Sequence, residues 1–459
     1  MVQPRRFVQR SLMPVDAATA FRWHERPGAL QRFMPPWETH QIVRLPASLQ
    51  PGQQAILKMK IGPFWKTWVA EHRRYQSGVE FQDVQLSGPF QSFDHTHRLI
   101  PGDNGTCWLE DEIDYVPPGG RLGQWLGDAF IQQTLQRAFR YRHSITAGDL
   151  AVHAQHRKAS AMKVLVTGAT GMVGSTLIPF LSTGGHETYR LMRSASQEPN
   201  DIPWDPARGE IAQSRLEGLD GVVHLAGENI AGRRWTTKVK QRLRDSRIEG
   251  TRLLCESLAK LKNPPKVVVC ASAIGYYGDR GNESLTEESP AGSGFLPELC
   301  VEWEKACEPA RAAGIRVVNL RIGVVLSLKG GALQQMKLPF QFGAGGVMGS
   351  GQQYWSWIAL DDLIGAILHC LTHEPLQGPV NATAPNPATN YEFTKTLGAV
   401  LKRPTLVPLP AFAARLALGE MANDLLLASA RVLPTRLQVT GFQFRYPTLE
   451  QALRHALGM

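Results

Sequence analysis

Three glycines that follow a short apolar run are the residues whose spacing points most directly to chemistry. The run spans residues 163–167, and Gly168, Gly171 and Gly174 come after it. A tight turn after a buried strand needs glycine where the backbone must come close to a bound pyrophosphate. The amides and the dipole at the start of the next helix then hold that anion. The order of strand, glycines and helix therefore predicts a dinucleotide-binding turn.

The end of the second strand in such a unit decides which dinucleotide is bound. An NAD-selective site usually carries Asp or Glu there, which holds the ribose 2′-hydroxyl. Here the segment is Tyr189-Arg-Leu-Met-Arg193, with two cations and no acid. Arg193 is placed to pair with a 2′-phosphate, and its planar guanidinium suits that group. The sequence predicts NADP as the cofactor; the alternative is that Arg193 stays in water.

Alternating strands and helices are expected to position this turn. Apolar runs at 220–227, 266–272 and 315–321 each end in small or polar residues, with helical stretches between them. This alternation is typical of the α/β class with a Rossmann-type, doubly wound parallel sheet, in which ligands bind at the carboxyl ends of the strands. We assign residues 162–459 to this domain, with a C-terminal substrate subdomain from about residue 325.

A different pattern occupies residues 1–155. Residues 41–116 show the two-residue period of antiparallel strands, and an apolar stripe at helical spacing follows. Strands followed by one long amphipathic helix predict an α+β domain whose curved sheet wraps around that helix. Residues 156–161 have no periodicity and indicate a linker. The predicted helical stripe comprises Leu122, Trp125, Leu126, Phe130, Leu135 and Phe139.

Short motifs in this first part resemble the START-like, helix-grip superfamily that includes polyketide cyclases. The motifs are Phe21-Arg-Trp-His24, Pro35-Pro-Trp37, Phe81-Gln-Asp83, Gly88-Pro-Phe90 and His95-Thr-His97. The resemblance covers roughly residues 5–150 and implies an apolar cavity, and hence a hydrophobic ligand. His95 and His97 face one side of a strand and could act as ligands or bases. No third ligand has a fixed spacing, so we expect a hydrogen-bonded structural role and no bound metal.

The second part resembles the extended or atypical short-chain dehydrogenase/reductases, and most closely the NAD-dependent epimerase/dehydratase family. The general motifs are Gly168-Ala-Thr-Gly-Met-Val-Gly174, His224-Leu-Ala-Gly227 and Ala273-Ile-Gly-Tyr-Tyr-Gly278. More specific ones are Gly227-Glu-Asn-Ile230, Arg233-Arg-Trp235, Ser246-Arg247, Gly330-Gly-Ala-Leu333, Gly349-Ser-Gly351, Ser356-Trp-Ile358 and Gly378-Pro-Val-Asn-Ala-Thr-Ala-Pro385. The resemblance covers nearly all of residues 162–459.

This resemblance implies a set of site residues. Ser272 and the segment around Arg321 are expected near the nicotinamide, with Arg321 counted among the cofactor-binding residues. The other residues expected to bind the dinucleotide are Gly168, Thr170, Gly171, Met172, Val173, Arg193, Leu225, Ala226, Gly227 and Arg247.

The catalytic pair departs from the pattern of the superfamily, where a Tyr and a Lys four residues later move a proton. Alignment on Trp303-Glu304 puts Leu296 and Cys300 at those two positions. The YxxxK match at residues 391–395 comes about 90 residues too late, and we attribute it to chance. Neither Leu nor Cys can replace the pair, so the standard chemistry is in doubt while dinucleotide binding is not.

Two adjacent tyrosines are the nearest replacement proton donors. Tyr276 and Tyr277 follow Ser272, which stands beside Ala273, the residue in register with the usual Ser or Thr. We select Tyr276 and Ser272 as candidate catalytic residues; a core tyrosine satisfied by the backbone is the alternative. Asp361 and Asp362 are expected to cap the helix that follows them rather than to form a charged pair at the site.

Composition and charge narrow the possible partners. The net charge is +10, but residues 1–161 hold 19 Lys and Arg against 14 Asp and Glu, so the excess is shared evenly. This distribution argues against a nucleic-acid-binding domain. The six cysteines form no close CxxC pair, which fits reduced thiols and disfavours zinc. No apolar stretch reaches membrane-spanning length and no signal-like segment opens the chain, so we expect a cytoplasmic protein.

Two functions are compatible with these features. The first is an NADP-dependent oxidoreductase or epimerase that acts on a small substrate, with a proton from Tyr276, Ser272 or water. The second is a catalytically silent NADP-binding module that couples redox state to ligand capture by the N-terminal cavity or to a protein partner. The intact motif set favours the first, which we predict, and the missing Tyr/Lys pair favours the second.

Overall fold

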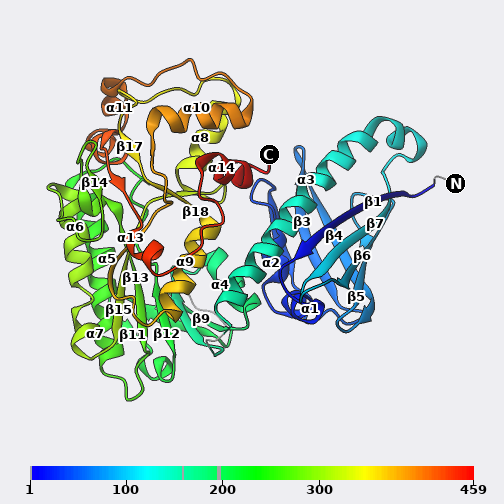
Figure 1. Cartoon of the computed structure of the whole chain (residues 1–459), viewed down its shortest axis with the longest axis horizontal. Coiled ribbons are helices and arrows are strands. Elements are labelled where there is room, and N and C mark those ends of the chain that lie inside the picture. The colour runs from blue at the N-terminus through cyan, green and yellow to red at the C-terminus, as the bar shows by residue number, and fades with distance from the viewer. Residues whose placement is uncertain (1–2, 158–159, 194–197) are drawn as a thin grey trace. The chain divides into compact units, whose positions relative to one another are not determined.

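The computed structural model describes residues 3–157, 160–193 and 198–459, and only the backbone of residues 120–126. Backbone contacts divide the chain into two compact units, which Figure 1 shows. Unit 1 comprises Met1–Lys158, Ser182–Gly185 and Gly458, and unit 2 comprises Ala159–Leu181, His186–Leu457 and Met459. Among the described residues, no helix is both long and apolar enough to cross a membrane.

Unit 1 is built on an antiparallel sheet with the strand order β1-β7-β6-β5-β4-β3-β2. The long helix α3 packs against β1 and β7, as Figure 1 shows. The predicted α+β helix-grip fold is confirmed. The elements are β1 (Arg5–Met13), α1 (Ala17–Glu25), α2 (Ala29–Phe33), β2 (His40–Arg44), β3 (Gln54–Ile61), β4 (Phe64–Gln76), β5 (Glu80–Ser87), β6 (Ser92–Pro101), β7 (Cys107–Val116) and α3 (Gly120–Gln155).

The apolar stripe predicted on α3 is correct only in part. Leu135 and Phe139 pack in the core with Phe7, Ile113 and Tyr115 of the sheet. Phe130, however, is 73% exposed. It precedes Phe139 by nine residues, which turn a helix through roughly 900°, so the two side chains leave opposite sides of α3. Three other members of the stripe, Leu122, Trp125 and Leu126, lie outside the residues whose side chains are described.

Unit 2 contains a mostly parallel sheet with the order β11-β10-β9-β8-β12-β13-β15-β19. The chain moves outward from β8 in one direction and then restarts at β12 in the other, which is the order of a Rossmann sheet. The strands are β8 (Lys163–Thr167), β9 (Glu187–Met192), β10 (Asp201–Asp205), β11 (Glu210–Ile211), β12 (Gly221–His224), β13 (Val267–Ala273), β15 (Arg316–Ile322) and β19 (Gly378–Ala382).

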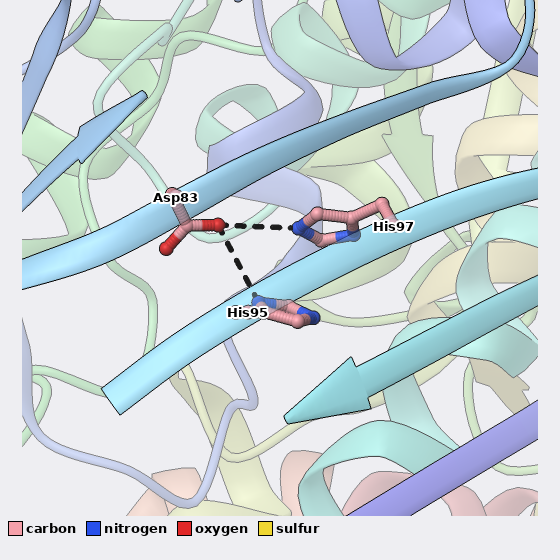
Figure 2. Close-up of side chains that lie close together, drawn as sticks. All are labelled: Asp83, His95 and His97. Carbon is pink, nitrogen blue, oxygen red and sulfur yellow. Dashed lines mark hydrogen bonds and ion pairs between the residues drawn. The ribbon is translucent and has the colours of Figure 1, made fainter. Parts of the chain in front are cut away.

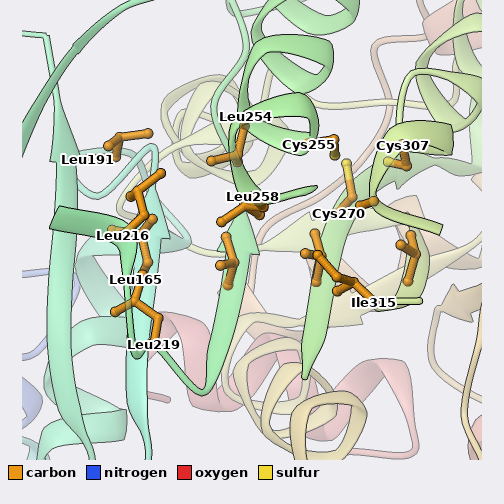
Figure 3. Packing of buried hydrophobic residues seen from close by; sticks show 14 of the residues in the cluster. Leu165, Leu191, Leu216, Leu219, Leu254, Cys255, Leu258, Cys270, Cys307 and Ile315 are labelled. Carbon is orange, nitrogen blue, oxygen red and sulfur yellow. The ribbon is translucent and has the colours of Figure 1, made fainter. Parts of the chain in front are cut away.

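The apolar runs of the sequence form the centre of this sheet. Leu165, Val222 and Val268 stand side by side in register on β8, β12 and β13, all fully buried. Figure 3 shows this core with Leu254 and Leu258 of α5 (Thr237–Ala259) packed in it. The residue that follows each of the three strand positions is also fully buried, although it points to the opposite face. Both faces are therefore covered, as the continuous apolar runs predicted.

Further helices and short strands complete unit 2. Its helices are α4 (Gly174–Thr183), α6 (Phe295–Lys305), α7 (Glu308–Ala312), α8 (Gly331–Gln341), α9 (Leu360–Thr372), α10 (Asn390–Leu401), α11 (Ala411–Leu418), α12 (Glu420–Ala422), α13 (Thr435–Val439) and α14 (Leu449–Leu457), with short turns η1 (Gln213–Leu216), η2 (Ile274–Tyr277) and η3 (Asn423–Leu427). Three small sheets pair β14 (Ser284–Leu285) with β21 (Arg431–Val432), β16 (Val324–Leu326) with β18 (Trp357–Ala359), and β17 (Tyr354–Trp355) with β20 (Ala388–Thr389).

A buried ion pair fixes α3 within unit 1 and provides a test of its stability. The Arg32 guanidinium donates to both carboxylate oxygens of Asp149 at 2.7 and 2.8 Å, and both side chains are almost fully buried. Asp149→Ala leaves that cation buried without its main partner, so we expect the free energy of unfolding of unit 1 to fall by about 3–5 kcal/mol in a denaturant titration.

The matched control is Asp114→Ala. Asp114 accepts the same two-pronged contact from Arg6, at 2.8 Å for both bonds, but on the surface of the sheet. We expect this loss to stay below about 1 kcal/mol, because solvent screens the pair. Equal losses in the two variants would contradict the structural role given to the buried pair.

Candidate functional site

The turn after β8 can be built only with glycine at two positions. Gly168 has a φ of +64°, and a Cβ there would lie 2.9 Å from the backbone of Leu225. A Cβ on Gly174 would lie 2.3 Å from the carbonyl oxygen of Gly168. The Gly171 amide closes the turn by donating to that same oxygen at 3.0 Å. Thr170 and Gly171 are exposed at its tip, so a ligand can reach the turn.

A chain of hydrogen bonds holds the ends of β8 and β12 together. The Thr167 hydroxyl oxygen accepts from the Leu225 and Ala226 amides, both at 3.0 Å. Its proton can go to His224 Nδ1 at 2.8 Å, since His224 Nε2 lies 3.0 Å from the Thr251 hydroxyl. Burial lowers the pKa of His224 to about 4. The imidazole is therefore neutral at physiological pH and serves as a structural link.

Arg247 lies beside the end of β12 at the same edge of the sheet. From α5 its guanidinium donates to the carbonyl oxygen of Glu228 at 2.9 Å and lies over the Trp303 ring at 5.1 Å. A Cβ on Gly227 would be 3.4 Å from Arg247 Cζ, so the guanidinium sits directly against that glycine. These contacts bring Leu225, Ala226, Gly227 and Arg247 together at the carboxyl end of β12.

The two cations at the end of β9 have different environments. Arg190 is bound by Asp201 of β10, with Nη2 to Oδ2 at 2.7 Å. Arg193 follows the last residue of β9 and its side chain is exposed. Arg193, which the sequence predicts to pair with a 2′-phosphate, is thus exposed, whereas Arg190 is paired with Asp201.

Ser272 lies at the end of β13 in a buried polar network. Its hydroxyl donates to Glu304 Oε1 at 2.7 Å. Glu304 is also bound by Arg321, whose Nε and Nη2 donate to the two carboxylate oxygens at 2.8 and 2.9 Å. Arg321 is only 3% exposed, and all its guanidinium nitrogens have protein partners. Ser272 and Arg321, which are expected near the nicotinamide, are thus both held in position by Glu304.

The two tyrosines of η2 differ in accessibility. Tyr277 is fully buried; its hydroxyl donates to Asn381 Oδ1 at 2.7 Å and accepts from Arg321 at 3.0 Å. Burial raises the pKa of Tyr277. Tyr276 is half-buried, and the Arg321 guanidinium carbon lies 3.4 Å from the centre of its ring. Tyr277 is therefore the satisfied core tyrosine, and Tyr276 is the more accessible of the two.

Leu296 and Cys300, the two residues that replace the usual Tyr and Lys, face the end of β13 from α6. Leu296 would touch a Cβ on Gly275 at 3.3 Å, and the Cys300 thiol lies 3.8 Å from the Ala273 carbonyl oxygen. Burial raises the pKa of Cys300 to about 12. The thiol is neutral at pH 7, so neither side chain offers an ionisable group to a substrate.

The expectation that Asp361 and Asp362 cap α9 is wrong. The N-cap is Ala359, without a side-chain cap, and both acids lie within the first turn, where the helix dipole favours them. Asp362 instead accepts from the backbone amides of Arg445 and Tyr446 at 2.7 and 3.1 Å, and Asp361 contacts His455 Nε2 at 2.8 Å. The two carboxylates thus hold the C-terminal segment against the start of α9.

Sequence reasoning missed two members of the polar network. Glu304 served only as an alignment mark, although its carboxylate binds both Ser272 and Arg321. Asn381 was part of a motif but had no role, and its side chain holds Tyr277. The signal available for Glu304 was an acid four residues after Cys300 on a predicted helix, one turn beyond the altered pair.

Comparisons with known proteins identify both parts of the chain. The pattern of the NAD dependent epimerase/dehydratase family matches residues 164–382. An epimerase family protein of Mycobacterium leprae is 41% identical over 293 residues, which make up 64% of this chain and 95% of that protein. The chain belongs to the NAD-dependent epimerase/dehydratase family. The human epimerase family protein SDR39U1 is 39% identical over 298 residues, 64% of this chain and 99% of its own.

The epimerase-family fold of unit 2 and the additional N-terminal domain also appear in solved structures. The nucleoside-diphosphate sugar epimerase from Corynebacterium glutamicum is 32% identical with a TM-score of 0.82, covering 98% of this chain and 90% of that one. Human SDR39U1 with NADPH is 37% identical with a TM-score of 0.60, and the match covers 65% of this chain and 100% of that one. The polyketide cyclase/dehydrase and lipid transport family matches residues 13–140, and a domain of unknown function matches 409–456. The predicted family resemblances and the fold class are confirmed.

The residues of the turn fit a dinucleotide of this family. Gly168 and Gly174 leave no space for a Cβ, while the tip of the turn is exposed at the start of α4. Such a turn offers its amides and the positive end of the helix to a diphosphate. The site is therefore of the type that NAD(P) requires, which agrees with the family.

Gly174→Ala tests whether the turn depends on this close packing. The added methyl group would overlap the Gly168 carbonyl oxygen, so we expect the free energy of unfolding of unit 2 to fall by about 1–3 kcal/mol. The affinity for the dinucleotide should fall as well, because the turn would be displaced. Gly250→Ala on α5 is the control, because its Cβ would meet Trp204 at an ordinary 3.7 Å. Thermal unfolding and calorimetric titration measure the two effects. A Gly174→Ala protein as stable as Gly250→Ala would refute the argument.

Proposed function

We propose that unit 2 is an NADP-dependent oxidoreductase or epimerase that acts on a small substrate, with Tyr276 as the proton donor or acceptor. The observation that carries this proposal is the position of Tyr276 at the end of β13, half-buried and stacked on Arg321. Its neighbour Tyr277 is committed to Asn381, so Tyr276 is the phenol left for a substrate. The first substrates to screen are nucleotide sugars, since a relative is named a nucleoside-diphosphate sugar epimerase.

The cofactor part of the proposal rests on the edge of the sheet at β8, β9 and β12. Gly168, Thr170, Gly171, Met172 and Val173 would hold the diphosphate and Arg193 the 2′-phosphate. Leu225, Ala226, Gly227 and Arg247 would flank the dinucleotide at the end of β12. When bound, the nicotinamide supplies hydride transfer.

The protein's own contribution is orientation and proton transfer. Glu304 fixes Arg321, and Arg321 lies against the face of Tyr276. This cation–π contact holds the ring of Tyr276 in one orientation. Ser272 would act only indirectly, because its hydroxyl donates its hydrogen bond to Glu304. Arg321 and Ser272 would therefore position Tyr276, without a direct part in proton transfer.

A catalytically silent NADP-binding module is the second candidate. The observation in its favour is the apolar environment of Leu296 and Cys300, where most of the superfamily has its proton-transfer pair. With the pKa of Cys300 raised to about 12 by burial, no acid or base stands there at pH 7. In that case the unit would bind the cofactor and report on redox state to a ligand or a protein partner.

Cofactor choice is tested with Arg193→Ala. Loss of a charge-assisted contact to the 2′-phosphate is worth about 1.5–3 kcal/mol, so we expect NADPH affinity to fall roughly tenfold or more. NADH affinity should stay the same, because NADH lacks that phosphate. Arg252→Ala, which removes another surface arginine, is the control. Calorimetry with both cofactors gives the result, and equal losses of NADPH and NADH affinity would overturn the choice of NADP.

The choice between enzyme and silent module is tested with Tyr276→Phe and Cys300→Ala. In the enzyme, losing the general acid should lower the rate by about 10²–10⁴ with little effect on NADPH affinity. Cys300→Ala should leave both unchanged, since a neutral buried thiol takes no part. NADPH absorbance reports redox turnover of carbonyl compounds, and product analysis reports epimerisation of nucleotide sugars. No turnover by the wild type would favour the silent module, and loss of activity only in Cys300→Ala would make the thiol the catalyst.

A further inference from the structure

The interior face of the unit 1 sheet carries a group of histidines and aspartates. His95 and His97 lie two residues apart on β6 and therefore face the same side. Asp83 on β5 stands directly opposite His95, and Asp111 on β7 stands directly opposite His97. Directly opposed residues point to the same face of a sheet, so these four side chains from β5, β6 and β7 gather on one face.

One carboxylate oxygen and two imidazole nitrogens meet in this group. Asp83 Oδ2 lies 3.3 Å from His97 Nε2 and 3.5 Å from His95 Nδ1, as Figure 2 shows. The three side chains each offer one ligand atom, and these atoms all lie within 4.8 Å of one another. Ligands about 2.0–2.1 Å from an ion in a tetrahedral site are roughly 3.3 Å apart. The two measured separations match the edges of such a site.

The other nitrogen of each imidazole faces a second carboxylate. Asp111 Oδ1 lies 3.2 Å from His95 Nε2 and 2.6 Å from His97 Nδ1. Its other oxygen is 2.6 Å from His143 Nε2 of α3. Metal-ligating histidines normally give their second N–H to a carboxylate, which fixes the ring orientation. Here one aspartate, itself held by a third histidine, orients both rings toward Asp83.

The contacts of Asp83 Oδ2 within the protein are long for a partly buried carboxylate. Charge-assisted N–H···O⁻ bonds usually measure about 2.7–2.9 Å, whereas both contacts of Asp83 Oδ2 exceed 3.2 Å. A carboxylate oxygen whose protein contacts are all long has capacity for a further cation.

Additional donors surround the same point. Within the described residues, His24 Nε2 and His72 Nδ1 are buried and have no hydrogen-bond partner. The His24 ring centre lies 6.4 Å from that of His97. Buried polar atoms without partners are uncommon, and a bound ion with its water is one ordinary explanation.

We propose that Asp83, His95 and His97 bind one divalent transition-metal ion of the Zn²⁺ class, with Asp111 as the outer carboxylate. Two imidazoles and one carboxylate suit such ions, whereas Mg²⁺ and Ca²⁺ prefer oxygen ligands alone. Three protein ligands leave a fourth position for water or a small ligand, as in catalytic rather than structural zinc sites. The sequence predicted no metal because the third ligand lies on another strand. The inference is independent of the function proposed for unit 2.

The test is metal titration of the full-length protein after treatment with a chelator. We expect one equivalent of Zn²⁺ or Co²⁺ per chain, and no comparable binding of Mg²⁺ or Ca²⁺. Asp83→Asn and His97→Gln should each weaken Zn²⁺ binding by about 100-fold or more, and Asp111→Asn by about 10–100-fold. The matched control is Asp94→Asn, because Asp94 is on the same strand as the histidines but faces solvent. Less than a tenth of an equivalent, or equal affinities for Asp83→Asn and Asp94→Asn, would overturn the site.

X-ray absorption on the Zn²⁺-loaded wild-type protein keeps the test independent of how the variants fold. We expect only nitrogen and oxygen neighbours, at about 2.0–2.1 Å. A sulfur shell at about 2.3 Å would place the ion on the thiols and refute the proposal. A Co²⁺-loaded protein should show visible d–d absorption without a thiolate charge-transfer band, and the presence of that band would count equally against the site.

Discussion

The close approach of the Gly168 backbone to Leu225 is the constraint on which the rest of unit 2 depends. It joins the carboxyl ends of β8 and β12 at the point where the strand order reverses. Thr167 maintains the approach, because one hydroxyl oxygen binds two successive amides of the opposite strand end. A side chain on Gly168 would separate the ends, and the amides of the turn and the start of β12 would no longer line one edge.

The polar network at β13 brings a charged side chain next to the two positions of the altered Tyr/Lys pair. Leu296, Cys300 and Glu304 are spaced by four residues on α6, so they share one face of the helix. The first two fill the space near Gly275 and Ala273 with apolar or neutral groups. Glu304, one turn later, brings a carboxylate to this face and binds Arg321, which lies over the ring of Tyr276. The charged side chain on this face of α6 is therefore Glu304, one turn beyond the altered pair.

The sequence predicted what depends on local patterns and missed what depends on register between distant segments. Runs such as residues 163–167 predicted buried parallel strands because both faces are covered. Phe130 was placed wrongly because a helical stripe was extended across a five-residue gap before Leu135. The partners of Ser272 and His95 could not be found, since Glu304 lies 32 residues later and Asp83 meets His95 only through the pairing of β5 with β6.

The two units have opposite electrostatic preferences. The turn after β8 presents backbone amides and a helix N-terminus, which attract an anion. The interior of unit 1 presents the carboxylates of Asp83 and Asp111 beside the imidazoles of His95 and His97. A phosphate would be repelled there, whereas a cation gains the attraction of Asp83 and Asp111 in surroundings that screen charge poorly. A dinucleotide at the turn of unit 2 and the proposed metal ion in unit 1 would therefore occupy sites that favour ligands of opposite charge.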